Sequence, residues 1–290
     1  MNAPVDRSRL HGVIGIFDSG VGGLSVLRAI WRELPDASTI YVADSIHCPY
    51  GERSIREIIA LSEGISRFLI DRGAEAIVVA CNTASAAALS VLRQHDPKIP
   101  FVGMVPAVKP AARLTRTGVV GVLATPNTFG GQLYHDVVEH HASGVRVVSR
   151  VCEGLVQCVE RGDLESAGTE RLLRACVEPL LAAGADTLVL GCTHYPFLMP
   201  TLQRLFGEDV RLVEPSQAVA RQAHRVLAGR KSAHMASDDR DETVTRTFYT
   251  TGDPTECAVQ IENLLGMRAE VSGLYWKTGR LAKDDHELGR

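Results

Sequence analysis

A chain of 290 residues is long enough for two domains, and its 45% hydrophobic content is sufficient for two cores. A net charge of −3 and 5% aromatic residues give neither the basic surface nor the stacking platform of a nucleic-acid-binding protein. The sequence has no apolar run of bilayer length, no apolar signal-peptide core and no CxxC pair among its seven cysteines, which together predict a cytoplasmic protein without a membrane segment or a disulfide framework.

The first predicted strand, Val13 to Phe17, ends at Asp18 and is followed by a glycine-rich turn, Ser19 to Gly23. A helix is predicted from Leu24 to Leu34, because its apolar residues recur at helical spacing. Such a turn lets the backbone approach a ligand, although a tight turn alone would use the same glycines. The turn lacks the GxGxxG spacing of a dinucleotide site. Asp18 has two interpretations: it binds a substrate ammonium, or it caps the helix that follows.

The second predicted strand, Thr39 to Ala43, leads into a turn that contains His47, Cys48, Tyr50 and Gly51. The Tyr50 hydroxyl and the Gly51 backbone amide are both usable as hydrogen-bond donors. His47 and Cys48 are neighbours, and adjacent side chains on an extended segment point apart. This pair therefore does not predict a metal site.

A helix from Ile55 to Arg72 precedes the run Ala76 to Ala80, whose five uninterrupted apolar residues predict a strand buried on both faces. Cys81 follows directly, at the end of the strand that borders the ligand crevice in open α/β sheets. The next helix is predicted from Ala84 to Leu92, with Asn82 and Thr83 as candidate caps. Its N-terminus is expected to lower the pKa of Cys81. A buried cysteine that packs as a small hydrophobe is the plain alternative.

The stretch around Cys81 occurs twice. GAEAIVVACNTAS at residues 73 to 85 aligns without gaps with GADTLVLGCTHYP at residues 184 to 196, so Cys192 is the counterpart of Cys81. Upstream of these, GVIGIFDSG at residues 12 to 20 aligns with GVVGVLATP at residues 118 to 126, where Ala124 takes the position of Asp18. A repeat of this length predicts two related α/β domains, with one cysteine from each at a shared site.

The remaining elements follow from the same patterns. Further strands are predicted at residues 99–105, 118–123, 145–151, 187–191, 210–213 and 247–251. Helices are predicted from residue 155 and at residues 172–183, 218–227 and 257–265. Residues 230–245 are predicted to be a surface loop, and residues 277–290 a frayed end.

This order of elements predicts an α/β fold of two pseudosymmetric domains, each an open and mainly parallel sheet flanked by helices. We expect the first domain to comprise residues 1–105 and 215–290, because the second unit is complete near residue 214. The second domain is then residues 106–214. The active site is expected in the cleft between them.

Two opposed thiols suit one kind of reaction. A thiol whose pKa approaches neutrality can act as a general base, so Cys81 and Cys192 would remove and deliver a hydrogen on opposite faces of one carbon. His194 is a candidate partner that holds or exchanges the proton of Cys192. Donors at Asn82-Thr83 and Thr193-His194 would bind a carboxylate. No lysine motif for a pyridoxal Schiff base and no phosphate cradle are present, so no cofactor is predicted.

Six motifs between residues 13 and 196 resemble those of the glutamate racemases in the aspartate/glutamate racemase family: DSGVGG, YVAD, CPYG, ACNTAS, LVQCVERG and GCTHYP. TTGDP, which ends at Pro254, extends the similarity. The resemblance implies a pseudosymmetric, cofactor-free enzyme that interconverts L- and D-glutamate. It also implies a homodimer that supplies D-glutamate for peptidoglycan.

The same resemblance implies roles for individual residues. Cys81 and Cys192 would be the paired acid and base, with Asp18, Glu160 and His194 assisting proton movement, and no metal ligand is implied. The segment before Glu160 departs from the family's more apolar pattern, and Glu153 competes for its role; a solvated helix carboxylate is the plain alternative for Glu160. The implied substrate contacts are Asp18, Ser19, Tyr50, Gly51, Asn82, Thr83, Thr193 and His194.

Three other interpretations remain at this stage. A relative with the same scaffold could act on aspartate, hydantoins or malonates. A metal-binding or redox-sensing protein could use Cys48, Cys81, Cys192 and His194. A two-lobed periplasmic-type binding module has a similar architecture, but the predicted lack of a signal peptide weighs against it.

Overall fold

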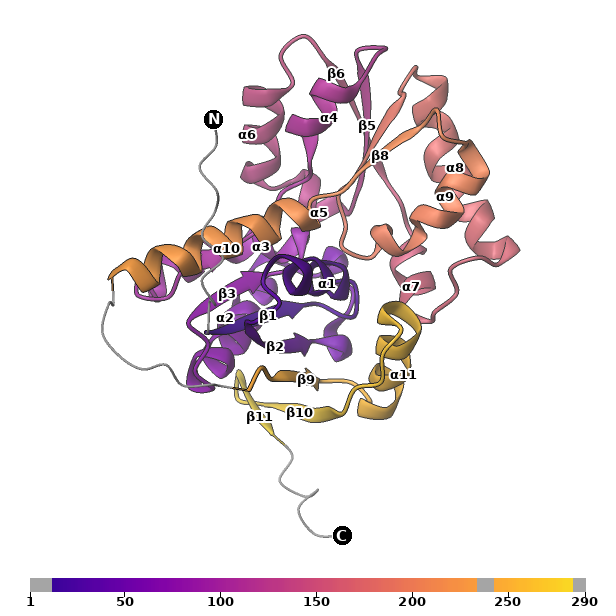
Figure 1. Cartoon of the computed structure of the whole chain (residues 1–290). Helices are drawn as coiled ribbons and strands as arrows, with labels where there is room; N and C mark the ends of the chain where they lie inside the picture. Colours follow the sequence, from indigo (N-terminus) through magenta and orange to yellow (C-terminus); the bar gives the residue numbers. More distant parts are fainter. Residues whose placement is uncertain (1–11, 234–242, 284–290) are drawn as a thin grey trace.

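A computed structural model describes residues 12–233 and 243–283 of the chain and contains two β-sheets with helices packed on both faces (Figure 1). The strands are β1 Val13–Asp18, β2 Ser38–Ala43, β3 Ala76–Val79, β4 Phe101–Val102, β5 Val119–Ala124, β6 Arg146–Val151, β7 Thr187–Leu190, β8 Arg211–Val213, β9 Arg246–Thr250, β10 Val271–Lys277 and β11 Arg280–Lys283.

The helices lie between these strands in the order of an α/β protein. They are α1 Leu24–Glu33, α2 Ile55–Asp71, α3 Asn82–His95, α4 Val108–Leu114, α5 Pro126–Phe129, α6 Gln132–His141, α7 Leu155–Glu160, α8 Ala167–Ala182, α9 Met199–Phe206, α10 Ser216–Ala233 and α11 Pro254–Leu265. Short 3₁₀ turns are η1 Ser45–His47, η2 Tyr50–Glu52 and η3 Tyr195–Leu198.

The larger sheet has the strand order β11-β10-β9-β2-β1-β3-β4, and the smaller sheet has the order β6-β5-β7-β8. All neighbouring strands within the described residues are parallel except β10 and β11. The predicted class, α/β with open and mainly parallel sheets flanked by helices, is therefore confirmed.

The internal repeat in the sequence corresponds to a repeat in the structure. The order β2-β1-β3-β4 recurs as β6-β5-β7-β8. Ile14 of β1 pairs with Ala76 of β3, and Val120 of β5 pairs with Thr187 of β7. These are the positions that the gap-free alignments equate, so the two halves share register as well as strand order.

The apolar runs before the two cysteines are buried on both faces, as predicted, since every residue of β3 and β7 is buried. Alternate residues of the larger sheet face different cores: Ile14 and Ile16 lie in the cluster with α1 and α10, whereas Phe17 lies in the cluster with α2 and α3. This two-sided burial explains why β3 and β7 read as continuous apolar runs.

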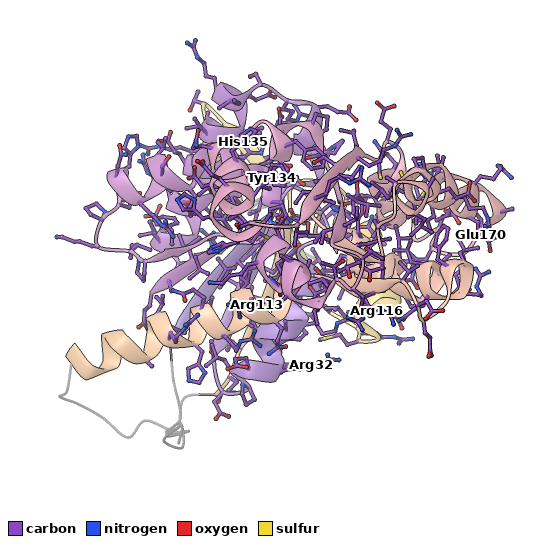
Figure 2. The ribbon with its side chains drawn as sticks, turned by 90° about the horizontal axis from the view of Figure 1, so that it is seen from above. Arg32, Arg113, Arg116, Tyr134, His135 and Glu170 are labelled. Carbon is purple, nitrogen blue, oxygen red and sulfur yellow. The ribbon has the colours of Figure 1, made fainter. Side chains whose placement is uncertain are left out.

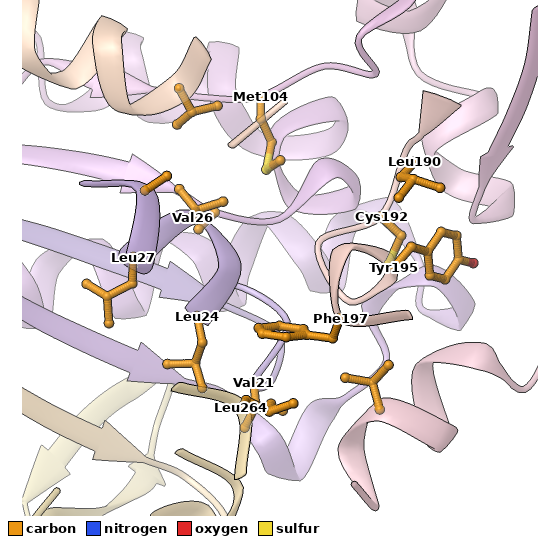
Figure 3. Packing of buried hydrophobic residues seen from close by; sticks show 14 of the residues in the cluster. Val21, Leu24, Val26, Leu27, Met104, Leu190, Cys192, Tyr195, Phe197 and Leu264 are labelled. Carbon is orange, nitrogen blue, oxygen red and sulfur yellow. The ribbon is translucent and has the colours of Figure 1, made fainter. Parts of the chain in front are cut away.

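One apolar cluster continues from the larger to the smaller half of the molecule. It contains Leu24 and Val26 of α1 together with Cys192, Tyr195 and Phe197, which follow β7. Figure 3 shows the Phe197 ring pointing from this loop towards α1. The two sheets are therefore joined by shared apolar packing beside the second cysteine.

Several helix boundaries differ from the predictions, and α11 begins at Pro254 rather than at residue 257. Helix α3 begins at Asn82 rather than Ala84, because Cys81 takes the N-cap position and its Sγ accepts the Ala84 amide at 3.4 Å. Helix α8 begins at Ala167 rather than at residue 172, because Ser166 caps it. Helix α10 is longer at both ends than predicted.

The C-terminal part returns to the first sheet, as expected. Strand β9 pairs with β2, and β10 and β11 extend the edge, where the yellow strands lie beside the indigo ones in Figure 1. The prediction of a frayed end is wrong for residues 277–283, because β10 and β11 form a hairpin whose turn residues, Thr278 and Gly279, both have positive φ. Threonine seldom adopts that conformation, so the turn signal was weak. Residues 284–290 lie outside the described part of the chain.

The predicted loop at residues 230–245 is only partly described. Residues 230–233 continue α10, so that part of the prediction is wrong. At the other end, the Thr245 amide donates to the Ser38 hydroxyl at 3.0 Å, next to the start of β2. Residues 234–242 lie outside the described part of the chain.

The charged side chains labelled in Figure 2 come from different parts of the molecule: Arg116 follows α4, whereas Glu170 lies on α8. Arg116 lies 3.8 Å from Asp186, and Glu170 lies 2.7 Å from Arg204. Among the described residues, no helix combines the length and the apolar character needed to cross a bilayer.

Helix α2 packs closely on the C-terminal hairpin at Gly64. A Cβ at Gly64 would lie 2.6 Å from the Trp276 ring and 2.9 Å from the Gly279 carbonyl oxygen. We expect Gly64→Ala to lower the free energy of unfolding by about 1–3 kcal/mol, measured by urea denaturation. Gly229→Ala is the matched control: that helical position has open space, and the substitution should raise the stability by about 0.5–1 kcal/mol. Equal changes in the free energy of unfolding for the two variants would contradict the close packing of Gly64 against the hairpin.

Candidate active site

Residues from both sheets line one small cavity at the carboxyl ends of their strands. Its volume is about 10 Å³, roughly the space for a single water. Cys81 and Cys192 both border it, so the structure brings the duplicated cysteines to one place. The lining is Ser19, Pro49, Tyr50, Gly51, Cys81, Asn82, Thr83, Thr125, Val156, Cys192, Thr193 and His194.

Cys81 is buried at the N-cap of α3, beside Asp18. Burial raises the pKa of its thiol well above the ordinary value, and the negative charge of Asp18 adds to the rise. The hydrogen bond from the Ala84 amide lowers the pKa by less than this. The expectation of a lowered pKa is therefore wrong for this closed cavity, because desolvation outweighs the helix terminus.

Cys192 is also buried, and it has a different partner. Its Sγ lies 3.6 Å from Nδ1 of His194, and Nε2 of the same ring lies 2.6 Å from Oε1 of Glu160. Burial by itself lowers the pKa of His194, but hydrogen bonds to Cys192, Cys48 and Glu160 outweigh it and raise that pKa well above its usual range. The surroundings of His194 therefore favour its protonated form.

Glu160, at the end of α7, accepts donors from both halves of the molecule. Its Oε1 accepts the Val21 amide at 2.9 Å, the His194 ring at 2.6 Å and the Cys48 thiol at 3.5 Å. Burial by itself raises the pKa of Glu160. The hydrogen bonds from His194, Val21 and Cys48 lower the pKa by a larger amount, so the net pKa is below the ordinary value. Glu153, the competing candidate, is exposed and does not border the cavity.

Asp18 lies at the end of β1 and is completely buried. Its Oδ2 accepts the Gly23 amide at 2.7 Å and the Thr193 hydroxyl at 3.4 Å. Burial raises its pKa by more than the nearby His194 charge and the amide hydrogen bonds lower it. Because Gly23 is the N-cap of α1, Asp18 satisfies a helix-terminal amide and also lies beside the Cys81 thiol.

Tyr50 borders the cavity, and the proton of its hydroxyl is already donated within the protein. It donates to Oδ2 of Asp44 at 2.6 Å, whereas Thr251 and Trp276 donate to Oδ1 at 2.8 and 2.9 Å. The expected use of this hydroxyl as a donor is therefore corrected. His47 also faces Asp44, at 3.0 Å, while Cys48 faces Glu160, so these neighbours point apart as predicted.

The Asn82 side chain is buried, and neither its oxygen nor its nitrogen has a hydrogen-bond partner in the protein. A buried primary amide without partners is costly, and this one borders the cavity. Next to it, the Thr83 hydroxyl lies 2.8 Å from that of Thr125, across the two halves. The unpartnered amide therefore indicates where a polar ligand would bind.

The glycines of the DSGVGG turn are needed for close approach rather than for unusual backbone angles. A Cβ at Gly20 would lie 2.0 Å from Oε1 of Glu160, and one at Gly22 would lie 2.3 Å from Nδ1 of His194. The turn thus fits against the second half of the chain, and not only against a ligand as the sequence suggested.

Thr125, Val156 and Pro49 border the cavity but were not among the predicted site residues. A signal for Thr125 was present, because the repeat alignment equates it with Ser19. The hydrogen bonds of Val21 and Cys48 to Glu160 had no such signal, since they join segments far apart in the sequence.

The fold and this cavity define an α/β enzyme with one thiol from each half facing a shared space. A family model described as Asp/Glu/Hydantoin racemase matches residues 14–223. A glutamate racemase of Stutzerimonas stutzeri is 49% identical over 89% of this chain and 96% of its own length. One of Roseiflexus sp. is 50% identical over 87% and 91%, respectively.

Solved structures with a similar fold are also glutamate racemases. Glutamate racemase isoform RacE1 from Bacillus anthracis has a TM-score of 0.80 and 32% identity, with 93% of this chain and 98% of that chain covered. The Escherichia coli glutamate racemase, in complex with L-glutamate and the activator UDP-MurNAc-ala, has a TM-score of 0.77 and 33% identity, with 90% and 97% covered. The chain belongs to the Asp/Glu/Hydantoin racemase family, and it is a racemase.

The link between Glu160 and His194 can be tested directly. We expect Glu160→Gln to lower the pKa of His194 towards its ordinary value, because the carboxylate that stabilises the imidazolium is removed. The ring would then lose its proton at a lower pH. NMR titration of histidine-labelled protein measures this, with the signal assigned by its loss in His194→Gln. Glu153→Gln is the matched control; an unchanged His194 titration in Glu160→Gln would contradict the interaction.

Proposed function

We propose that this racemase interconverts L- and D-glutamate by proton transfer between its two thiols and the Cα atom, without a cofactor. The observation that carries this proposal is that Cys81 and Cys192, one from each half, border a single cavity. The names of the relatives and of the solved structures, all glutamate racemases, support glutamate as the substrate.

The two thiols begin in different states. The His194 ring, whose pKa is raised, lies with Nδ1 3.6 Å from Cys192 and would donate to its sulfur when that residue acts as the base. Cys81 remains a thiol, because burial and Asp18 oppose its ionisation. Cys192 is then the base that removes the Cα hydrogen, and Cys81 is the acid that donates one to the other face. Racemisation in the opposite direction uses the same two cysteines with their roles exchanged, because Cys192 then carries the proton and Cys81 has lost its own.

The groups around the thiols would bind the amino acid. The unpartnered amide of Asn82 supplies a donor and an acceptor, and Thr83, Thr193 and Ser19 add hydroxyls. These donors would stabilise the negative charge that develops on the α-carboxylate next to Cα. Asp18 does not border the cavity in this structure, so its carboxylate would balance the substrate ammonium only once the cavity has widened. A cavity of about 10 Å³ is too small for an amino acid, so substrate entry requires it to widen.

Wider roles follow from the similarity to glutamate racemases. We propose that the enzyme acts as a homodimer and that its product, D-glutamate, is used for peptidoglycan. All seven cysteines are free thiols, which suits the reducing environment of the cytoplasm. We further propose that the two sheets mark two domains, residues 1–105 with 215–290 and residues 106–214.

Replacing either thiol tests the mechanism. We expect Cys81→Ser and Cys192→Ser each to lower the rate of glutamate racemisation by about 10² to 10⁴-fold, because a hydroxyl is a far weaker base than a thiolate. Circular dichroism should remain that of a folded protein. Cys158→Ser, at a buried cysteine that does not border the cavity, should racemise normally. Full activity in either of the first two variants would refute the two-thiol mechanism.

Deuterium labelling tests whether two bases act. When L-glutamate is racemised in deuterium oxide, the early D-glutamate should carry deuterium at Cα, while the recovered L-glutamate should not. The reason is that the base which removes the hydrogen is not the acid that returns one. Mass spectrometry of the separated enantiomers measures this. Early deuterium in the recovered L-glutamate would instead indicate one base that serves both faces.

A further inference from the structure

Three side chains of different chemistry meet behind the catalytic cavity. Sγ of Cys48, Oε1 of Glu160 and Nε2 of His194 all lie within 4.8 Å of one another. Two of the separations are 3.5 Å from Cys48 to Glu160 and 2.6 Å from Glu160 to His194. The three residues come from η1 and its following turn, from α7, and from the loop after β7, so only the tertiary fold assembles them.

This donor set matches the preferences of zinc. Zinc in proteins is bound by thiolate, imidazole and carboxylate, commonly with three protein ligands and an open fourth position. Zinc–ligand bonds of 2.0 to 2.3 Å in a tetrahedron separate a sulfur from an oxygen by about 3.6 Å and a nitrogen from an oxygen by about 3.4 Å. The Cys48–Glu160 separation already fits, and the Glu160–His194 separation would need to widen.

The cluster borders a second cavity, which adjoins the catalytic cavity at Pro49 and Val156. Cys48 and Glu160 border this second cavity of about 300 Å³, which is also lined by Ser45, Arg161 and Cys257. Neither Cys81 nor Cys192 borders it. His194 borders the small catalytic cavity, so the three side chains form the wall between the two spaces. A metal ion and its fourth ligand, a water molecule, fit on the side of the larger cavity.

We propose that Cys48, Glu160 and His194 form an inhibitory binding site for Zn²⁺. The ion takes Nε2 of His194 and Oε1 of Glu160, so it replaces the hydrogen bond between them. Because the Glu160–His194 separation must widen to hold the ion, the ring shifts relative to the Cys192 sulfur, which its Nδ1 faces at 3.6 Å. The site is distinct from the adjacent pair His47 and Cys48, whose side chains point apart.

This arrangement determines the kind of inhibition. Because the ion enters from the larger cavity, it does not lie between the two thiols. Zinc should therefore lower kcat for racemisation by a larger factor than it raises KM, since His194 also borders the catalytic cavity. The predicted inhibition rests on the proposed function as a glutamate racemase, whereas the predicted binding of zinc does not depend on it.

The experiment uses the full-length protein, treated with a chelator and then dialysed against Zn²⁺ or Co²⁺ without substrate. We expect one ion per chain, and a cobalt spectrum with the thiolate charge-transfer band and the intense visible bands of a tetrahedral site. Cys48→Ser removes one ligand and should weaken zinc binding by at least about tenfold. Cys257→Ser is the matched control, because Cys257 borders the same cavity but lies outside the cluster.

The rate measurements are compared with the metal-free rate of each variant. Wild type and Cys257→Ser should be inhibited at the same zinc concentration, and Cys48→Ser should need at least about tenfold more. Zinc binding that survives in Cys48→Ser but is lost in Cys81→Ser or Cys192→Ser would overturn the proposal in favour of the catalytic thiols. Failure of wild type to retain any ion would also overturn it. If metal-free wild type bound cobalt as expected but did not racemise glutamate, the result would count only against the proposed function.

Discussion

The carboxylate of Glu160 is the contact on which the arrangement of the site depends. It is largely buried, so it needs donors, and it takes them from both halves: the Val21 amide at 2.9 Å and the His194 ring at 2.6 Å. Leaving such a charge unpaired would be strongly destabilising. Gly20 and Gly22 allow this contact, because a side chain at either position would occupy the space of Glu160 or His194. The glycine turn, the carboxylate and the imidazole therefore act as one unit that brings the two sheets together around the thiols.

The two halves share a scaffold but differ in chemistry. Strand order and register repeat, and each half contributes one buried cysteine after its apolar strand. The partners of these cysteines do not repeat: Asp18 lies beside Cys81, and its counterpart in the other half is Ala124, whereas His194 contacts Cys192. A buried carboxylate lies beside one thiol, and an imidazole lies 3.6 Å from the other. A duplicated fold thus gives its two cysteines different chemical surroundings at one site.

The C-terminal strands also reach the site. Trp276 of β10 and Thr251 donate to Asp44, and Asp44 accepts the hydroxyl of Tyr50, which borders the cavity. The return of the chain to the first sheet therefore holds a wall of the catalytic cavity in position, in addition to covering the edge of β2. On the opposite side of Glu160, the larger cavity leaves Cys48 and Glu160 accessible without opening the catalytic cavity. Glu160 thus borders the larger cavity directly and contacts His194, which borders the catalytic cavity.

The sequence by itself determined the buried strands, the repeat with its register, and the location of both cysteines at strand ends, because these follow from local apolar runs and gap-free alignment. It also singled out Asp18, Asn82 and His194 by their positions next to those strands. Only the tertiary structure decided that Glu160 rather than Glu153 contacts His194, that Tyr50 donates to Asp44, and that burial raises the pKa of Cys81. The hairpin of β10 and β11 likewise depends on a turn that its residues favour only weakly. Hydrogen-bond partners and pKa values depend on burial and on contacts between residues far apart in the chain, which a local pattern does not contain.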